Sequence, residues 1–291
     1  MAPVFAAVGA GLLAGVVVVL LVRRWPQTAM AAPRVDPATI RREVGRHRRL
    51  AQTLRPRVDP ETATGLALTV AGLVVIAGGA AVGVLLLMVR RNRGFARWDL
   101  SAARWAATHA TDASTSVLRV ISMLGGTMVI VIAVVLTLVF EQRRLRSRAV
   151  VLFLLVAVIG QNVLANGIKV LVDRARPDLS QLTGFASSSF PSGHATAAAA
   201  TYAAIALVVS RRRGPSVRAM LAGGAAAIAV AVAGTRVMLG VHWVTDVMAG
   251  LALGWAWFAL CSIAFGGRFM RFGSPVVVAE EAAEASRATP V

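Results

Sequence analysis

Cysteine, lysine and acidic residues are all scarce in this sequence of 291 residues. The one cysteine, Cys261, excludes an intramolecular disulfide and a cysteine-rich metal site. Charged residues make up 15% of the chain and hydrophobic residues 57%, whereas soluble domains contain about 25% and about 45–50%. Together with a mean hydropathy of +0.71, this composition excludes a disordered chain, a coiled coil and an ordinary soluble enzyme.

The basic residues are almost all arginine, because Lys169 is the one lysine among 31 basic residues. A chain rich in Ala, Val, Gly and Arg is typical of a bacterium with a GC-rich genome, so the retained lysine needs a specific explanation. The net charge of +18 alone would fit a nucleic-acid-binding protein. The arginines lie between apolar runs too long for a globular core, however, which indicates a membrane protein with no nucleic-acid partner.

Long apolar runs dominate the sequence, and most have the length that crosses a bilayer, about 20 residues. The fifth run is shorter and reaches that length if its helix begins at residues 191–194. Because each segment must satisfy its own backbone hydrogen bonds, the sequence predicts an all-α, polytopic transmembrane helix bundle with a six-helix core and one extra N-terminal transmembrane helix. The seven runs cover residues 4–22, 66–89, 117–140, 149–172, 195–210, 219–239 and 247–265.

Composition divides the chain into a transmembrane anchor at 1–22, a basic cytoplasmic loop at 23–65, a six-helix domain at 66–266 and a disordered cytoplasmic tail at 267–291. The first segment has a second interpretation as a signal peptide, but no basic residue precedes its apolar run. The loop either fixes topology only or forms a basic helix on anionic lipid. Aromatic side chains among small and polar residues at 95–116 indicate an interfacial amphipathic helix.

Polar residues interrupt the membrane segments in three clusters. Charges there cost about 2.5–3.5 kcal/mol each, so their presence indicates function. The clusters are K-V-L-V-D-R-A-R-P at 169–177, P-S-G-H at 191–194 and T-R-V-M-L-G-V-H-W-V-T-D at 235–246. Cations at helix ends and a helix start with free N–H groups predict an anion site that also contains two histidines and one carboxylate. The cations are Lys169, Arg174, Arg176 and Arg236.

Local geometry predicts a place for several of these residues. Ser192 is expected to be the N-cap of a helix, and Gly193 lets the backbone approach an anion. His242 and Asp246 are four residues apart, so on a helix they share a face where the carboxylate fixes the imidazole tautomer. Gly240 can end the helix that precedes them.

Two structural alternatives stand beside this interpretation. Asp173 is four residues from Lys169 and is expected to pair with it rather than to take part in chemistry. His194, His242 and Asp246 include common metal ligands, although the neighbouring cations disfavour a divalent cation.

The order and spacing of the clusters resemble the tripartite signature of the type 2 phosphatidic acid phosphatase and vanadium haloperoxidase superfamily. That signature reads Lys-x6-Arg-Pro, Pro-Ser-Gly-His and Ser/Thr-Arg-x5-His-x3-Asp, and the resemblance covers about residues 66–266. The membrane segments favour the membrane lipid phosphate phosphatase branch. The matching residues are Lys169, Arg176 and Pro177, then Pro191, Ser192, Gly193 and His194, then Arg236, His242 and Asp246.

The resemblance implies a lipid phosphatase that uses a phosphohistidine and no metal or other cofactor. It makes His242 the nucleophile, Asp246 its orienting carboxylate, and His194 the group that protonates the leaving oxygen and then activates water. The implied substrate is a membrane lipid phosphate, with polyprenyl pyrophosphate preferred and phosphatidic acid or phosphatidylglycerophosphate as alternatives. A non-enzymatic phosphate-binding transporter is a more remote alternative. The implied phosphate ligands are Lys169, Arg176, Ser192, Gly193 and Arg236.

Loop charges predict a multi-pass protein of the cell membrane with its active site on the outer face. With the N-terminus outside, the cytoplasmic segments contain 21 of the 31 basic residues, as the positive-inside rule requires. The basic stretch at 90–104 then lies outside and runs against the rule. The arginine-rich loop before it is expected to dominate.

Overall fold

The computed structural model describes residues 1–24, 60–145, 147–177, 188–211 and 213–266. Within this part of the chain every regular element is an α-helix, which confirms the predicted fold class. The predicted tail at 267–291 and most of the predicted loop at 23–65 lie outside the described residues. The helices are α1 (Ala2–Arg24), α4 (Pro60–Arg91), α5 (Ala96–His109), α6 (Asp112–Met123), α7 (Thr127–Leu145), α8 (Arg148–Val172), α9 (Gly193–Ser210), α10 (Pro215–Met238) and α11 (Val244–Gly266).

Six of these helices are long and apolar enough to span a membrane, and the bent pair α6–α7 raises the number to seven if it counts as one span. The third apolar run was predicted as one helix, and this prediction is wrong in detail, because the pair is bent by 43° at its break. At the break, Gly125 packs against two other helices. A methyl group there would lie 2.6 Å from Val232 and 2.9 Å from the carbonyl oxygen of His194.

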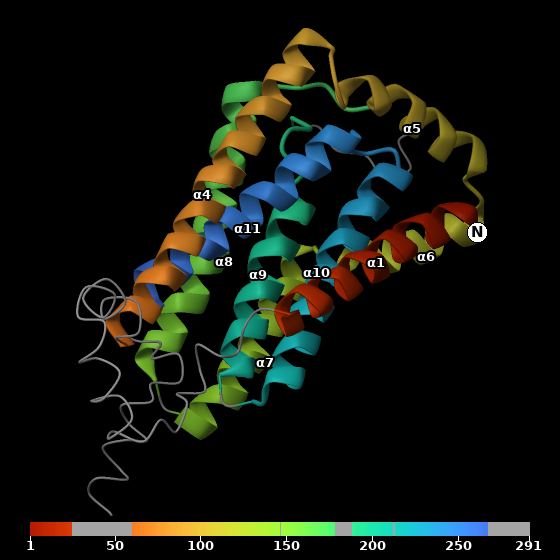
Figure 1. Cartoon of the computed structure of the whole chain (residues 1–291). Coiled ribbons are helices and arrows are strands. Elements are labelled where there is room, and N and C mark those ends of the chain that lie inside the picture. Colours follow the sequence, from red (N-terminus) through yellow and green to blue (C-terminus); the bar gives the residue numbers. More distant parts are fainter. Residues whose placement is uncertain (25–59, 146, 178–187, 212, 267–291) are drawn as a thin grey trace, which may run out of the picture.

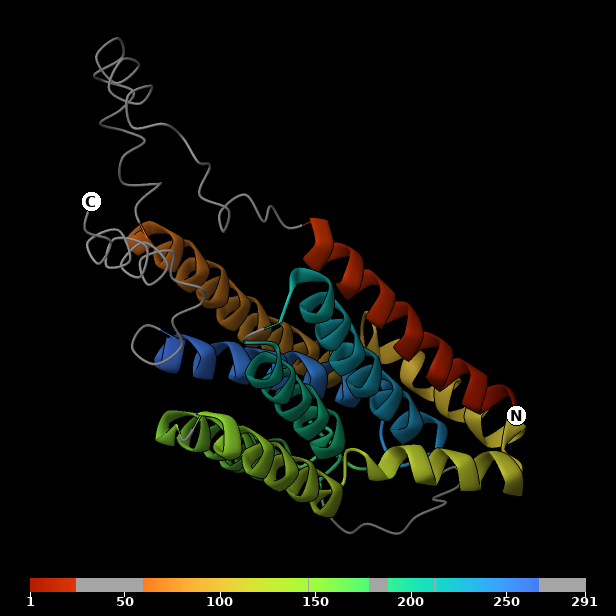
Figure 2. The ribbon, with the colours of Figure 1, turned by 90° about the horizontal axis from the view of Figure 1, so that it is seen from below.

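The helices α9, α10 and α11 form the centre of the bundle (Figures 1 and 2). The extra N-terminal helix α1 packs along α10, α4 packs along α11, and α8 packs on α9 and α11. The short helix α5 crosses one end of the bundle between α4 and α6 (Figure 1). This end is the one at which α8 finishes, α9 starts and the α10–α11 turn lies.

Small residues allow close contact along two helix pairs. On α1, a methyl group at Gly11 would lie 2.6 Å from the carbonyl oxygen of Ala227 in α10. On α11, methyl groups at Gly250 and Gly254 would lie 2.7 Å and 2.6 Å from carbonyl oxygens at the start of α9. The backbones of α9 and α11 therefore touch directly. This contact fixes the register between the helix that carries His194 and the helix that carries Asp246.

The helix α5 is amphipathic. Its buried face consists of three alanines and Asp99. Trp98, Leu100 and Trp105 are exposed on the other side. This pattern fits the predicted interfacial helix, whose position at a membrane surface stays a prediction.

Candidate active site

The three polar clusters predicted from the sequence meet at one end of the bundle. The backbone N–H of Ser192 donates to the carbonyl oxygen of Asp246 at 3.0 Å, which ties the start of α9 to the first turn of α11. Gly193 lies beside Lys169, since a methyl group there would be 3.5 Å from the lysine Nζ. Residues separated by 24 and by 54 positions in sequence are thus neighbours in the fold.

The turn between α10 and α11 places His242. Gly240 has a φ of +68°, a left-handed conformation that glycine adopts without strain, and it ends α10 as the sequence predicts. The backbone N–H groups of Val241 and His242 both donate to the carbonyl oxygen of Arg236 at 3.2 Å. The imidazole of His242 is consequently held in a buried position directly before α11.

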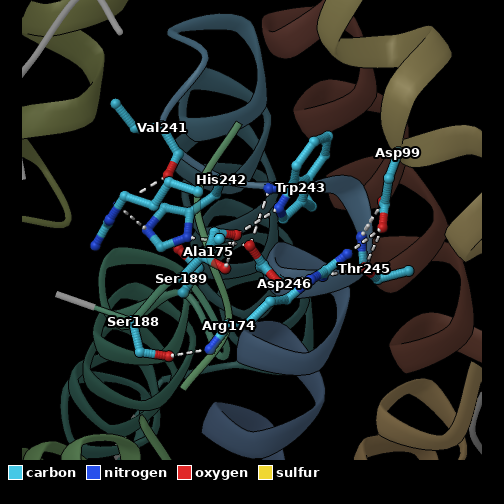
Figure 3. Close-up of polar contacts among 12 residues, drawn as sticks. Asp99, Arg174, Ala175, Ser188, Ser189, Val241, His242, Trp243, Thr245 and Asp246 are labelled. Carbon is cyan, nitrogen blue, oxygen red and sulfur yellow. Dashed lines mark hydrogen bonds and ion pairs between the residues drawn. The ribbon is translucent and has the colours of Figure 1, made fainter. Parts of the chain in front are cut away.

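The two nitrogens of His242 face groups of opposite kind (Figure 3). Nδ1 lies 3.5 Å from Oδ2 of Asp246, and Nε2 lies 3.4 Å from Nη1 of Arg176, which also donates to the Val241 carbonyl oxygen at 2.8 Å. A guanidinium can only donate, so Nε2 presents its lone pair and the proton resides on Nδ1. Burial lowers the pKa of His242 to about 4, against the opposing effect of Asp246. His242 is therefore neutral near pH 7, and the lone pair of Nε2 is available.

Asp246 is fully buried and has fixed partners on both oxygens. Oδ2 accepts a hydrogen bond from the backbone N–H of Trp243 at 2.9 Å, as an acidic side chain in a first helical turn commonly does. Oδ1 forms an ion pair with Nη1 of Arg174 at 2.5 Å. The carboxylate cannot rotate away from His242 without breaking these contacts.

Three cations of the signature lie close enough to the second histidine to interact with it electrostatically. The charges of Arg236, Lys169 and Arg176 all act on His194. Burial also lowers the pKa of Arg176. Arg236 is buried and donates through Nη1 to Oγ of Ser122 on α6 at 2.8 Å. The site therefore concentrates positive charge around both histidines, as a bound phosphate requires.

Ser192 occupies the N-cap position of α9, as predicted, but its side chain does not cap the helix. Its hydroxyl is buried and makes no hydrogen bond to the described part of the chain. A buried hydroxyl beside a helix N-terminus is suited to an anionic ligand oxygen. The role of Ser192 as a phosphate ligand stays a prediction supported by this geometry.

The predicted pairing of Asp173 with Lys169 is wrong, since no such ion pair forms among the described residues. Asp173 has a φ of +42° and ends α8, and its N–H donates to the carbonyl oxygen of Lys169. The helix therefore stops before the two side chains can share a face.

Metal binding finds little support in the side chains present. Within the described residues, no three of His, Cys, Asp and Glu are grouped as metal ligands. The oxygens of Asp246 are already occupied by Arg174 and Trp243.

Three residues that contact the site and help to hold it were not predicted from the sequence. Asp99 on α5 pairs with Arg174, Ser122 on α6 holds Arg236, and Gly125 packs against the backbone of His194. The available signal for Asp99 was a single acid in the strongly basic stretch that follows α4. Arg174 stood among the predicted cations, but its partner in the structure is carboxylate rather than phosphate.

Part of the chain is similar to known bacterial phosphatases. Lipid A 1-phosphatase of Rhizobium etli is 38% identical over 118 residues, which are 37% of this chain and 47% of the relative. Phosphatidylglycerophosphatase B of Bacillus subtilis is 38% identical over 125 residues, which are 41% of this chain and 60% of the relative. The chain thus spans about half the length of the curated relatives it matches.

A solved structure shares the fold. The crystal structure of a transmembrane PAP2 type phosphatidylglycerolphosphate phosphatase from Bacillus subtilis matches with a TM-score of 0.62 and 27% identity. The match covers 68% of this chain and 98% of that chain. Residues 150–270 also match the model of the PAP2 superfamily, and all three polar clusters lie inside this range. The region that carries all three motifs is therefore similar to the PAP2 superfamily.

Proposed function

We propose that this protein is a membrane lipid phosphatase that moves a phosphoryl group from a lipid to Nε2 of His242 and then to water. The observation that carries the proposal is the placement of His242, with Nδ1 facing Asp246 and Nε2 facing Arg176. A buried, neutral imidazole with its lone pair directed at cations has the properties of a nucleophile for phosphorus.

The proposed reaction has two steps. The Nε2 lone pair forms a bond to phosphorus while the bond from phosphorus to the lipid oxygen breaks, and His194 in its protonated form gives that oxygen a proton and becomes neutral. His194 then takes a proton from water, whose oxygen attacks phosphorus and releases phosphate from His242. Asp246 stabilises the imidazolium present between the steps. The phosphoryl oxygens are held by Lys169, Arg176, Ser192, the amide of Gly193, and Arg236.

The substrate is proposed to be an amphiphile whose phosphate reaches the membrane surface. Polyprenyl pyrophosphate remains the substrate that the sequence favoured. The similarity to a phosphatidylglycerophosphatase B and to a lipid A 1-phosphatase supports the phospholipid alternatives, phosphatidylglycerophosphate and phosphatidic acid. Each of these candidate substrates carries a phosphate next to lipid tails, so a single panel of lipid phosphates can test them together.

Phosphate release by the purified protein in detergent tests the proposal. Wild type and His242→Ala are compared on polyprenyl pyrophosphate, phosphatidylglycerophosphate, phosphatidic acid and lipid A. Wild type is expected to release phosphate from at least one lipid, and His242→Ala from none. Acid quench with labelled substrate should trap phosphate on wild type only. Saturable phosphate binding without release from any lipid would favour the transporter alternative.

Catalysis is proposed to need no divalent metal, because the cations of the site supply the positive charge. EDTA is expected to leave the rate nearly unchanged, and vanadate is expected to inhibit as a mimic of the transferred phosphoryl group. A rate lost in EDTA and restored by a metal ion would contradict this part of the proposal.

The active site is proposed to face outward from the cell membrane, on the charge distribution given above. In a Cys261→Ala background, single cysteines at Ser180 and Ser216 report the two sides. An impermeant maleimide is expected to label position 180 in intact cells and to spare position 216. The opposite pattern would place the site on the cytoplasmic face.

A further inference from the structure

Asp99 and Arg174 connect the short helix α5 to the carboxylate that faces the nucleophile. We propose that they are positioning residues, which hold Asp246 and through it His242 in place and balance the charge around His242. This inference deepens the proposed function and rests on it for the role of His242. Neither residue belongs to the superfamily signature quoted above.

The connection is a continuous chain of short contacts (Figure 3). Arg174 donates through Nη2 to Oδ2 of Asp99 at 2.7 Å and through Nη1 to Oδ1 of Asp246 at 2.5 Å. Thr245 joins the same network, because its backbone N–H donates to Oδ1 of Asp99 at 3.0 Å and its hydroxyl lies 2.7 Å from both Asp99 and Arg174. One guanidinium therefore spans two carboxylates from different helices.

Both carboxylates are buried, so their charges must be compensated within the protein. Asp99 is 4% exposed and Asp246 is not exposed at all, so each carboxylate needs a cation to offset its desolvation. Arg174 serves both, and its guanidinium also lies 5.4 Å from the centre of the Trp243 ring. The planar fork of arginine reaches two acceptors at fixed angles, which the single ammonium group of lysine cannot do.

The charges facing His242 come from every element around it. Asp246 contributes from α11, Arg236 from α10 and Arg176 from the segment after α8. His194 on α9 interacts with His242, and Lys169 on α8 interacts with His194 and Asp246. Arg174 lies behind Asp246, and the negative charge of Asp99 offsets it. With Asp99 present, the charge of Asp246 remains available to the imidazolium formed during the reaction.

The two residues are therefore expected to act on the protonation of His242 in opposite directions. Asp99→Asn removes a negative charge and lowers the pKa of His242. Arg174→Gln removes a positive charge and raises it. Each change is expected to amount to about 0.5 to 1 pH unit. The double variant Asp99→Asn/Arg174→Gln removes both charges and is expected to return the titration to the wild-type position.

Two measurements test this inference on the full-length protein in detergent. Nitrogen NMR of labelled histidine follows the titration of His242, assigned with His242→Gln. The pH profile of kcat/KM on one lipid phosphate follows the same group in catalysis. Both single variants are expected to lower kcat/KM about 10- to 100-fold through misplacement of the nucleophile, and Asp112→Asn, an exposed acid on α6, is the unchanged control.

Conservative variants separate position from charge. Arg174→Lys keeps the charge but loses the fork, so kcat/KM is expected to fall while the titration of His242 stays near wild type. Titrations that are identical in all variants, or that move in the same direction in both single variants, would overturn the inference. If the two single variants shift the pKa of His242 in opposite directions, as expected, but the wild-type protein releases no phosphate, the proposed function would be refuted instead.

Discussion

The two halves of the molecule differ in how they serve the site. Residues 147–266 carry every signature residue, and α9 and α11 are the most buried of the six unbroken candidate spans among the described residues. Residues 60–145 carry no signature residue and expose many large apolar side chains, yet they supply Asp99, Ser122 and Gly125. The difference teaches that one half provides the proposed reacting groups, whereas the other half contacts the residues that hold them.

The largest difference between the two halves is expected for their histidines. Each half contains one histidine, other than the proposed nucleophile, that can be replaced. His194→Ala removes the proposed proton donor and is expected to lower turnover by at least about 10³-fold. His109→Ala, on the exposed end of α5, removes a ring that stacks on Trp105 and is expected to leave turnover unchanged. Phosphate release from one lipid substrate by both variants checks this. Equal activity of the two variants would remove His194 from the mechanism.

A change in the first half is expected to reach the site through the backbone of α9. In Gly125→Ala the new methyl group must displace Val232 or the His194 carbonyl, and such a shift is expected to lower kcat about 10- to 100-fold. Gly79→Ala on α4 meets no atom within 4 Å and is the matched control. Single-turnover kinetics of both variants measure the effect. Normal kcat in Gly125→Ala would show that the break between α6 and α7 does not hold His194.

A smaller effect is expected where the first half supports a phosphate ligand. Ser122→Ala removes the acceptor for Nη1 of Arg236, and a lost hydrogen bond to a charged group is expected to raise KM about tenfold with little change in kcat. Ser101→Ala, which removes an exposed hydroxyl from α5, is the control. Steady-state kinetics decide between the outcomes, and a drop in kcat alone would assign Ser122 to the chemical step.

The smallest effect on activity is expected at the extra helix α1. Gly15→Val brings side-chain atoms against the backbone of Gly223 on α10 and is expected to destabilise the fold by about 1–3 kcal/mol. Gly9→Val on the same helix meets open space and should be neutral. Thermal unfolding in detergent compares the two. Activity below the unfolding temperature should change little, and a large loss would extend the positioning role to α1.

The sequence predicted the helices well, since apolar runs of membrane length leave few alternatives. It did not predict the break at residues 124–126, because hydrophobicity continues across it and only the approach to α9 and α10 requires it. The motifs identified His194, His242 and Asp246, and the fold places these residues at the same end of the bundle. Asp99 and Ser122 were invisible to this reasoning because their partners are more than 70 positions away in sequence.

One error shows why local spacing alone misleads. Asp173 stands four residues after Lys169, which on a continuous helix would favour an ion pair. The helix ends at Val172, and Asp173 adopts a left-handed conformation directly after it. Only the end of the helix, which depends on the tertiary contacts of the following loop, decides between the two interpretations.

The saturated carboxylate of Asp246 has a consequence for the path of protons. Both oxygens of this carboxylate already accept hydrogen bonds, from Arg174 and Trp243, so a proton arriving on Asp246 would have to displace one of these donors. In the proposed reaction, the positive charge on phosphorylated His242 is then held as an ion pair and the Nδ1 proton does not leave. In this proposal the leaving oxygen draws its proton from His194, so one histidine carries the phosphoryl group and the other transfers protons.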